Sequence, residues 1–278
     1  MIPEPDLSLI GNISDTNSAY NHPVIIAEFK RAGKALCYVA VRHVVGIENP
    51  ISAAIKSAVE QFNPDAVVIE SHYGHDNTGY VAYVHEQSAS GFKDSREDTY
   101  AAYLATQRKI PFVGGEPSDK TIMAGMIEAG YSSRDVQAFY LLRQIPVWRE
   151  EHKLSEQGFA EQATKFLGTI NSIFETSNDD ALNIVDFKKW YDKHNTTRKS
   201  FLEIENSDLA PINSEKASYF QILNHVMDPI RERNIITVIA NNLNEYDRVL
   251  VVYGNGHLTK SRPVFKKMFG HEPSIDVP

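Results

Sequence analysis

The chain has 278 residues, of which 42% are hydrophobic and 23% are charged, as expected for a globular protein with a core. Its formal net charge of −8 gives no general attraction for phosphate backbones or anionic lipids, so no nucleic-acid partner is expected. No apolar stretch reaches the ~20 residues that span a bilayer, so no transmembrane segment is expected. The single cysteine, Cys37, excludes an intramolecular disulfide, and the apolar run around it predicts a buried thiol.

The first 22 residues are rich in Asn, Ser, Asp and Pro, which predicts an irregular lead-in. The segment from Met1 to Asp6 has neither the basic start nor the apolar core of a signal peptide. A cytoplasmic location fits this segment, and so does an extracytoplasmic one if a leader has been removed.

Two β-rich runs, Pro23–Phe29 and Ala35–Val41, flank residues 30–34, and this pattern predicts an antiparallel hairpin. Asn49 and Pro50 are typical of a helix start, and apolar residues then recur at helical spacing. Residues 66–69 are continuously apolar, as in a strand that is covered on both faces. A strand, a helix and a strand of these lengths predict a parallel βαβ unit.

Most of the remaining chain has a helical pattern. Helices are predicted over residues 80–90, 95–108, 118–129, 134–145, 155–175, 181–193 and 214–243, the last interrupted at Pro229, and residues 194–213 are predicted to be irregular. Short strands are predicted at 110–113 and 248–253, before a short last helix. We therefore predict a single α/β domain over 1–278, with a central, mostly parallel sheet, an antiparallel N-terminal hairpin and a large helical insertion at about 120–245.

Four polar residues follow four of these strands, at the point where each strand ends. They are His43, Glu70, Glu116 and His257. Ligands of parallel sheets bind beyond the carboxyl ends of the strands, where residues distant in sequence meet. Each residue taken singly could be structural, but their coincidence at strand ends favours one composite site.

Two imidazoles and two carboxylates support two kinds of chemistry. They could hold a divalent metal such as Mn, Co or Zn, with a position left for a water that ionises readily. Without a metal, a carboxylate could orient a histidine that acts as a general base. Further polar groups lie in the loop with His72 and His75 and on the long helix at residues 231–234, where an arginine could bind an oxyanion or simply face solvent.

Familiar nucleotide-binding and hydrolase signatures are not found. The Gly-Asn-Gly of residues 254–256 lacks the third glycine of a dinucleotide fingerprint, and the chain has neither a Walker A loop nor a Gly-x-Ser-x-Gly elbow.

The chain resembles the TraB/Tiki/erythromycin-esterase-like superfamily in the order of its motifs, from about residue 24 to 270. The segments that carry the resemblance are Ala40–His43, Val68–Glu70, Arg233–Asn234 and Val252–Leu258. The last of these, a strand followed by Gly-x-x-His-Leu, is the most specific. The first departs from the usual Gly-x-x-His, because Ala40 stands in the place of the glycine.

The resemblance implies an α/β fold with a helical insertion. Its Tiki branch implies metal-dependent peptide cleavage by the two histidines and the glutamate, and its esterase branch implies hydrolysis with a histidine base. We therefore predict a hydrolase that cleaves a peptide or ester bond in a peptide or small-molecule substrate. In this hypothesis His43, Glu70 and His257 bind the metal or activate water, Glu116 is a fourth ligand or general base, and Arg233 stabilises the oxyanion.

Two alternatives stay open from the sequence. A ChaN-like branch of the superfamily binds haem, so the chain could be a haem or tetrapyrrole-binding protein that uses His72, Tyr73 and His75. It could also be a non-catalytic domain with a decayed site, for which Ala40 is the only indication.

Overall fold

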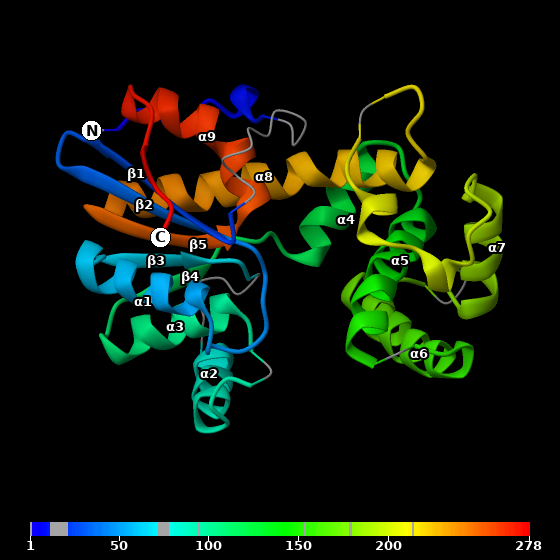
Figure 1. The fold of residues 1–278 in the computed structure, drawn as a ribbon. Coiled ribbons are helices and arrows are strands. Elements are labelled where there is room, and N and C mark those ends of the chain that lie inside the picture. The colour runs from blue at the N-terminus through cyan, green and yellow to red at the C-terminus, as the bar shows by residue number, and fades with distance from the viewer. Residues whose placement is uncertain are drawn as a thin grey trace. The chain divides into compact units, whose positions relative to one another are not determined.

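The computed structural model describes residues 2–11, 22–71, 78–93, 95–152, 154–177, 180–212 and 214–278. Two compact units make up the chain: Met1–Pro117 together with Glu232–Pro278, and Ser118–Arg231. The first unit contains the sheet and the second is helical (Figure 1). The second unit takes up most of the insertion predicted over 120–245, and the chain returns to the first unit within a long helix.

The first unit is built on a six-stranded sheet in the order β4-β3-β5-β2-β1-β6. The strands are β1 (Val24–Arg31), β2 (Lys34–Val41), β3 (Ala66–Ile69), β4 (Phe112–Gly114), β5 (Arg248–Gly254) and β6 (Ser274–Asp276). Strands β4, β3, β5 and β2 run parallel, whereas β1 pairs antiparallel with β2 and with β6. The predicted fold class is confirmed, with a mostly parallel sheet and an N-terminal hairpin.

The residues predicted to begin and end the first helix do so in the structure. Asn49 caps α1 (Pro50–Phe62) by accepting a 2.9 Å hydrogen bond from the Ser52 amide, and Asn63 ends the helix in the left-handed conformation with φ of 50°. Helix α1 connects β2 to β3, but these strands are not neighbours. Strand β5, which follows about 180 residues later, lies between them and pairs in parallel with both.

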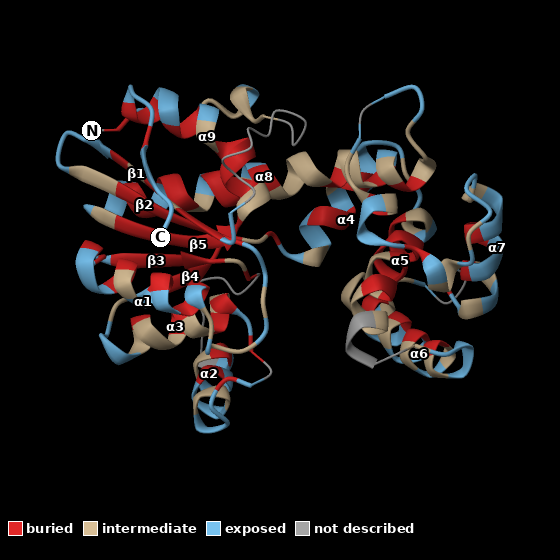
Figure 2. Cartoon of the chain, viewed as in Figure 1, coloured by how far each residue is buried: buried red, intermediate tan, exposed pale blue. Residues whose placement is uncertain are grey.

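Helices cover both faces of the sheet (Figure 1). One face packs on α9 (Asn255–Phe269) and on the last part of α8 (Tyr219–Glu245). The other face packs on α1, α2 (Thr78–Ala89) and α3 (Glu97–Gln107). Figure 2 shows the resulting buried strands, with β2, β3 and β5 as the centre of the core. This burial explains why β3 and β5 are almost continuously apolar in sequence.

The second unit has its own core, formed by α4 (Asp119–Glu128), α5 (Ser133–His152), α6 (Glu156–Ile173), α7 (Ile184–His194) and the first part of α8. Helix α5 continues through Pro146, where the sequence predicted an end, because buried Ile145 and partly buried Trp148 pack against this core and offset the lost hydrogen bond. Helix α8 begins at Tyr219 and runs on through Pro229. No helix among the described residues is long and apolar enough to cross a bilayer.

The secondary structure differs from the prediction in two segments whose sequence patterns are weak. Short 3₁₀ helices, Phe201–Glu203 and Asn206–Leu209, occur inside the segment predicted to be irregular. Strand β6 was not predicted, because its three residues are all exposed and form no apolar run. It exists because it pairs with β1 through Ile26, Ala27 and Glu28.

The thiol of Cys37 should be inert in the folded protein. The residue is 1% exposed on β2, and burial raises the pKa of its thiol to about 12. The thiolate is the reactive form of cysteine, so it is scarce at neutral pH. We expect Ellman's reagent to release no thiolate colour from native protein and one equivalent after denaturation. Rapid reaction of the native protein would show that this strand opens in solution.

Candidate functional site

The four strands that carry the predicted site residues end at nearly the same level. In the register of the parallel pairs, Ile69 on β3 lies opposite Val252 on β5 and Gly114 on β4. On the other side of β5, Val41 on β2 lies opposite Gly254. The residues that follow these positions therefore come together beyond one edge of the sheet, as the sequence predicted.

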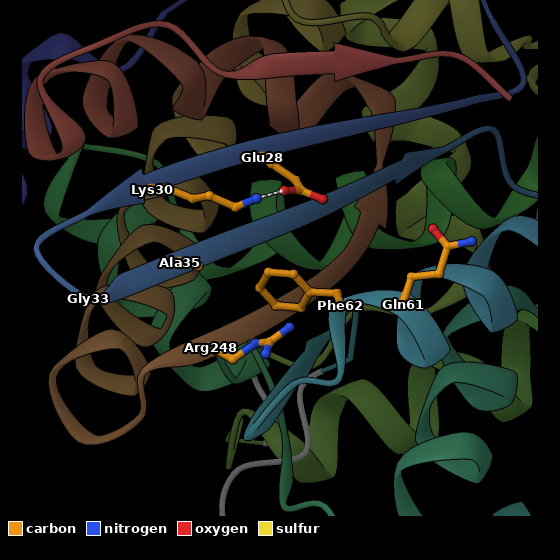
Figure 3. A pocket seen from close by; sticks show the side chains of 7 residues that line it. All are labelled: Glu28, Lys30, Gly33, Ala35, Gln61, Phe62 and Arg248. Atoms are coloured by element: carbon orange, nitrogen blue, oxygen red, sulfur yellow. Dashed lines mark ion pairs between the residues drawn. The ribbon is translucent and has the colours of Figure 1, made fainter.

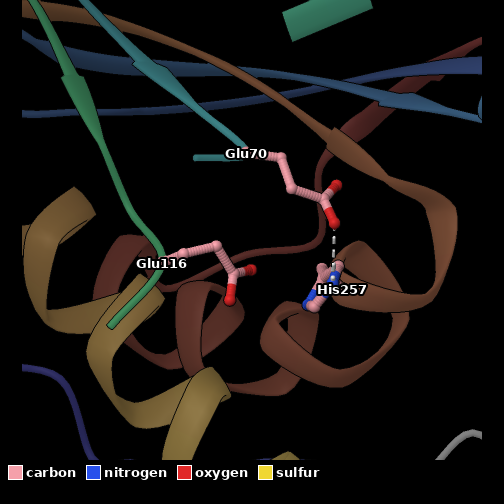
Figure 4. Close-up of side chains that lie close together, drawn as sticks. All are labelled: Glu70, Glu116 and His257. Carbon is pink, nitrogen blue, oxygen red and sulfur yellow. Dashed lines mark ion pairs between the residues drawn. The ribbon is translucent and has the colours of Figure 1, made fainter. Parts of the chain in front are cut away.

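Three of them form a tight acid–histidine cluster, consisting of Glu70, Glu116 and His257. One donor atom from each lies within 4.8 Å of the other two. Figure 4 shows both carboxylates turned toward the imidazole ring, and the Nε2 atom of His257 is 3.6 Å from Oε1 of Glu70. The side chains of Glu70 and His257 are 18% and 10% exposed, so the cluster is largely buried but reachable from solvent.

Glu70 lies at the amino end of α9. Its Oε2 atom accepts a 2.8 Å hydrogen bond from the amide of Gly254, the residue that caps this 15-residue helix. The free amides at the amino end of a helix carry partial positive charge, which stabilises a carboxylate placed there. The carboxylate that ends the apolar strand β3 is therefore held in place by backbone as well as by side chains.

Glu116 is positioned by the loop that follows β4. The amides of Gly115 and Glu116 donate to the carbonyls of Ile69 and Ser71 at 3.0 and 2.8 Å, and the side chain of Asn234 donates to the Gly115 carbonyl at 2.8 Å. A Cβ atom at Gly115 would lie 2.4 Å from the hydroxyl oxygen of Tyr253. The glycine is needed because the Tyr253 ring passes directly against the backbone here.

A buried carboxylate orients His257. Its Nδ1 atom lies 2.6 Å from Oε1 of Glu232, a residue on α8 that is 0% exposed. The ammonium of Lys260, which is 3% exposed, reaches the same oxygen at 3.0 Å. Because the carboxylate accepts, Nδ1 carries a proton, and Nε2 is the nitrogen presented to Glu70 and Glu116.

His43 is held in the same manner on the other side of Glu70. Its Nδ1 atom forms a short hydrogen bond to Oε1 of Glu97, whose side chain is 4% exposed, and the other Glu97 oxygen lies 3.4 Å from the amide of Val44. The Nε2 atom of His43 lies 3.6 Å from Oε2 of Glu70. Each oxygen of Glu70 thus faces the Nε2 atom of a histidine whose Nδ1 is bound by a separate carboxylate.

The stability of the chelator-treated protein should fall with rising pH because of His257. Burial lowers the pKa of His257, but the Glu232 carboxylate, with a contribution from Glu70, outweighs burial and raises the pKa to about 9. An unfolded histidine titrates near 6.5, so the folded state holds the proton more tightly. This stabilisation is complete below about pH 6.5 and is lost as the pH rises through about 9.

We expect the free energy of unfolding to decrease by on the order of 3 kcal/mol between these limits. Urea unfolding of the wild type and of His257→Asn over this pH range would measure the effect. His43, whose pKa is raised by its bond to Glu97, is present in both proteins and serves as the common background. Equal pH dependence in the two proteins would contradict the assignment to His257.

The structure groups the predicted residues differently from the sequence hypothesis, whose assignment of roles stays a prediction. The sequence grouped His43 with Glu70 and His257 as metal ligands and gave Glu116 a fourth or catalytic place. Among the described residues, Glu116 completes the three-donor group and His43 lies outside it. His43 approaches the opposite oxygen of Glu70, because its Nε2 atom lies 3.6 Å from Oε2 whereas the Nε2 atom of His257 lies 3.6 Å from Oε1.

The other predicted residues have different outcomes. Arg233 is exposed on α8, one residue from buried Glu232, so the helix turns its side chain away from the direction of the cluster, and its predicted part in catalysis stays a prediction. His72, Tyr73 and His75 lie outside the described residues.

Two carboxylates that hold the histidines were not predicted. Glu232 precedes buried Ile235 and Ile236 by three and four positions, so it lies on the apolar stripe of α8. Glu97 precedes buried Ala101 by four positions on α3 in the same way. A charge on the buried stripe of a helix is the sequence signal that could have identified both.

A separate hollow lies near the amino ends of β2 and β5, away from the cluster. It has a volume of about 540 Å³ and is lined partly by Arg248 and Phe62, with the Arg248 guanidinium 5.0 Å from the centre of the Phe62 ring (Figure 3). Lys30 pairs with Glu28 at 2.6 Å beside it. These charges have partners within the hollow, and the residues that line it include no acid–histidine group like that of the cluster.

Comparison of the chain with protein-family models, curated proteins and solved structures found no match. The function therefore has to be inferred from the geometry of the site.

Proposed function

We propose that the chain is a metal-dependent hydrolase that cleaves a peptide or ester bond, with Glu70, Glu116 and His257 as the metal ligands. The observation that carries the proposal is the orientation of His257. Histidine ligands of metals almost always donate their second ring N–H to a carboxylate or carbonyl, and Glu232 receives that hydrogen bond here. This contact leaves Nε2 directed at two carboxylates.

The donor set also fits a divalent ion in spacing and in ligand type. Two ligands bound at ~2.1 Å in tetrahedral geometry lie roughly 3.4 Å apart, close to the 3.6 Å between His257 Nε2 and Glu70 Oε1. Glu70 and Glu116 belong to the group itself, and Glu97 and Glu232 bind the two imidazoles beside it. Carboxylate oxygens and imidazole nitrogens are ligands that divalent ions such as Zn²⁺ take in proteins.

His43 has the position of a general base. A divalent ion at the cluster would polarise the substrate carbonyl and make an attacking water more acidic. The Nε2 atom of His43 takes a proton from that water as its oxygen attacks the carbonyl carbon. His43 returns the proton to the departing nitrogen or oxygen as the peptide or ester bond breaks, which leaves an acid and an amine or alcohol. Glu97 keeps the ring oriented throughout.

The exposure of the two histidines agrees with these different roles. The side chain of His43 is 44% exposed, whereas that of His257 is 10% exposed. A base must reach the water and the leaving group, while a ligand is best held rigidly. Scattered side chains would have favoured a decayed site, whereas the four side chains lie together at one edge of the sheet.

Metal analysis of the purified protein tests the proposal. We expect near-stoichiometric metal in wild type, or uptake after addition of Mn, Co or Zn, together with hydrolysis of peptide or ester substrates. His257→Ala should abolish both. Absence of metal under all these conditions would refute the proposal and direct attention to a metal-free histidine base or to haem binding.

A further inference from the structure

The buried lysine on α9 makes a contact that the proposed reaction does not explain. Lys260 is 3% exposed, and its ammonium lies 3.0 Å from Oε1 of Glu232. Lys260 lies three residues after His257, on the same side of the helix. Burying an ammonium is costly unless it is paired, so its position calls for a specific partner.

Lys260 and His257 converge on a single oxygen atom. His257 Nδ1 and Lys260 Nζ reach Oε1 of Glu232 at 2.6 and 3.0 Å. The other oxygen, Oε2, is buried and accepts no hydrogen bond from the described part of the chain. The lysine therefore fixes the carboxylate oxygen that receives the histidine N–H, and the carboxylate does not rotate freely between its two oxygens.

Lys260 also compensates the negative charge of the buried Glu232 carboxylate. A metal ligand must be a neutral imidazole, so His257 cannot balance the charge of Glu232 while it holds a metal. Glu232 is 0% exposed and has no solvent to stabilise its charge. The Lys260 ammonium supplies the compensating positive charge at hydrogen-bond distance.

We infer that Lys260 is a positioning residue, which acts through Glu232 to fix the orientation and the proton-bearing nitrogen of His257. The inference rests on the proposed metal site, and it adds a three-residue arrangement, Lys260–Glu232–His257, behind one ligand. In this arrangement Lys260 acts through its contact with Glu232 and is not itself a ligand.

Whether Zn²⁺ affinity rises or falls when Lys260 is replaced shows whether the lysine positions His257 or acts only as a nearby positive charge. If Lys260 were only a nearby positive charge, its removal would raise the affinity of the cluster for a cation. If it positions His257, its removal lowers that affinity, and loss of a group behind a ligand typically costs 10–100-fold. We expect Lys260→Met and Glu232→Gln each to weaken Zn²⁺ binding by about 10–100-fold, measured by competition with a chromophoric chelator.

Further variants show whether the lysine acts through the glutamate. Lys260→Arg keeps the charge and the donor and should bind Zn²⁺ nearly as wild type does. On the Glu232→Gln background, Lys260→Met should cause no further loss, because the link is already broken. This double variant also removes both buried charges, so it remains informative if Lys260→Met alone does not fold. Lys34→Met is the matched control, since Lys34 is a part-buried lysine paired with Asp247 at the far end of β2.

The outcomes distinguish this inference from the proposed function. Unchanged or tighter Zn²⁺ binding in Lys260→Met, with weaker binding in Glu232→Gln, overturns the inference and leaves the metal site intact. If wild type binds no Zn²⁺, the proposed function fails, and the inference is then tested by NMR on the metal-free protein. A slowly exchanging Nδ1–H resonance of His257 that is lost in Lys260→Met supports it, and a resonance that persists unchanged refutes it.

Discussion

Replacing His43 with glutamine is expected to leave the metal bound but to lower kcat by about 10²–10⁴-fold, the usual contribution of a general base. His43 lies outside the three-donor group, so the metal should stay when it is changed. Glutamine keeps hydrogen-bonding capacity but cannot accept the proton of water. The same substitution at His257 should remove the metal and the activity together, because it deletes a ligand.

Metal content and steady-state kinetics of the two variants, measured side by side, test this separation. His271→Gln is the matched control, because His271 is an exposed histidine that contacts the carbonyls of Lys30 and Glu272. It should retain both metal and turnover. If His43→Gln loses its metal, His43 returns to the ligand set that the sequence suggested, and Glu116 becomes the candidate for the base.

The positions of strands and strand ends were predictable, whereas their order across the sheet was not. Apolar runs locate β3 and β5, and the polar residue after each run identifies Glu70 and His257. No local sequence feature shows that β5 lies between β2 and β3 and pairs with both. The pairing joins segments that are separated in sequence by the whole second unit. Strand order decides which strand ends lie side by side, and the local sequence pattern does not reveal it.

The two carboxylates that bind the histidines, Glu97 and Glu232, were not predicted from the sequence for a different reason. Glu97 and Glu232 lie on helices, where a charged residue usually faces solvent, and Glu232 has an arginine on each side. Their burial becomes evident only when each is placed on the apolar stripe of its helix. The sequence pattern predicts a role for an arginine in the segment from 231 to 234, but the buried side chain that contacts His257 is the acid between the two arginines.

The glycine whose backbone lies close to His43 is Gly254, whereas the superfamily pattern predicts a glycine at position 40. The superfamily pattern has glycine three residues before the first histidine, and this chain has Ala40, which is buried in β2 opposite Tyr253. The close approach occurs instead at Gly254, where a Cβ atom would lie 3.0 Å from Nε2 of His43. Ala40 therefore does not prevent His43, Glu70 and His257 from lying close together in this chain.

Gly254→Ala is consequently expected to impair activity much more than stability. The φ of Gly254 is −58°, a value that alanine adopts without strain, so the backbone should not resist the change. The new Cβ would lie 3.0 Å from His43 Nε2 and 3.3 Å from Glu70 Oε2, which forces the base and the ligand apart. Misplacement of reacting groups by about 1 Å can cost about 10²-fold in rate, and we expect a loss of that size in kcat/KM.

The decrease in the free energy of unfolding should lie at the low end of the ~1–3 kcal/mol that overpacking costs, because the contacts involve the ends of side chains that can shift. Gly168→Ala provides the matched substitution, since its Cβ would meet no atom within 4 Å in α6 and a helical glycine is ~1 kcal/mol less stable than alanine. That variant should gain stability and keep its kcat/KM. Full activity in Gly254→Ala would mean that the close spacing of His43 and Glu70 is not required for turnover, and the assignment of His43 as the base would have to be abandoned.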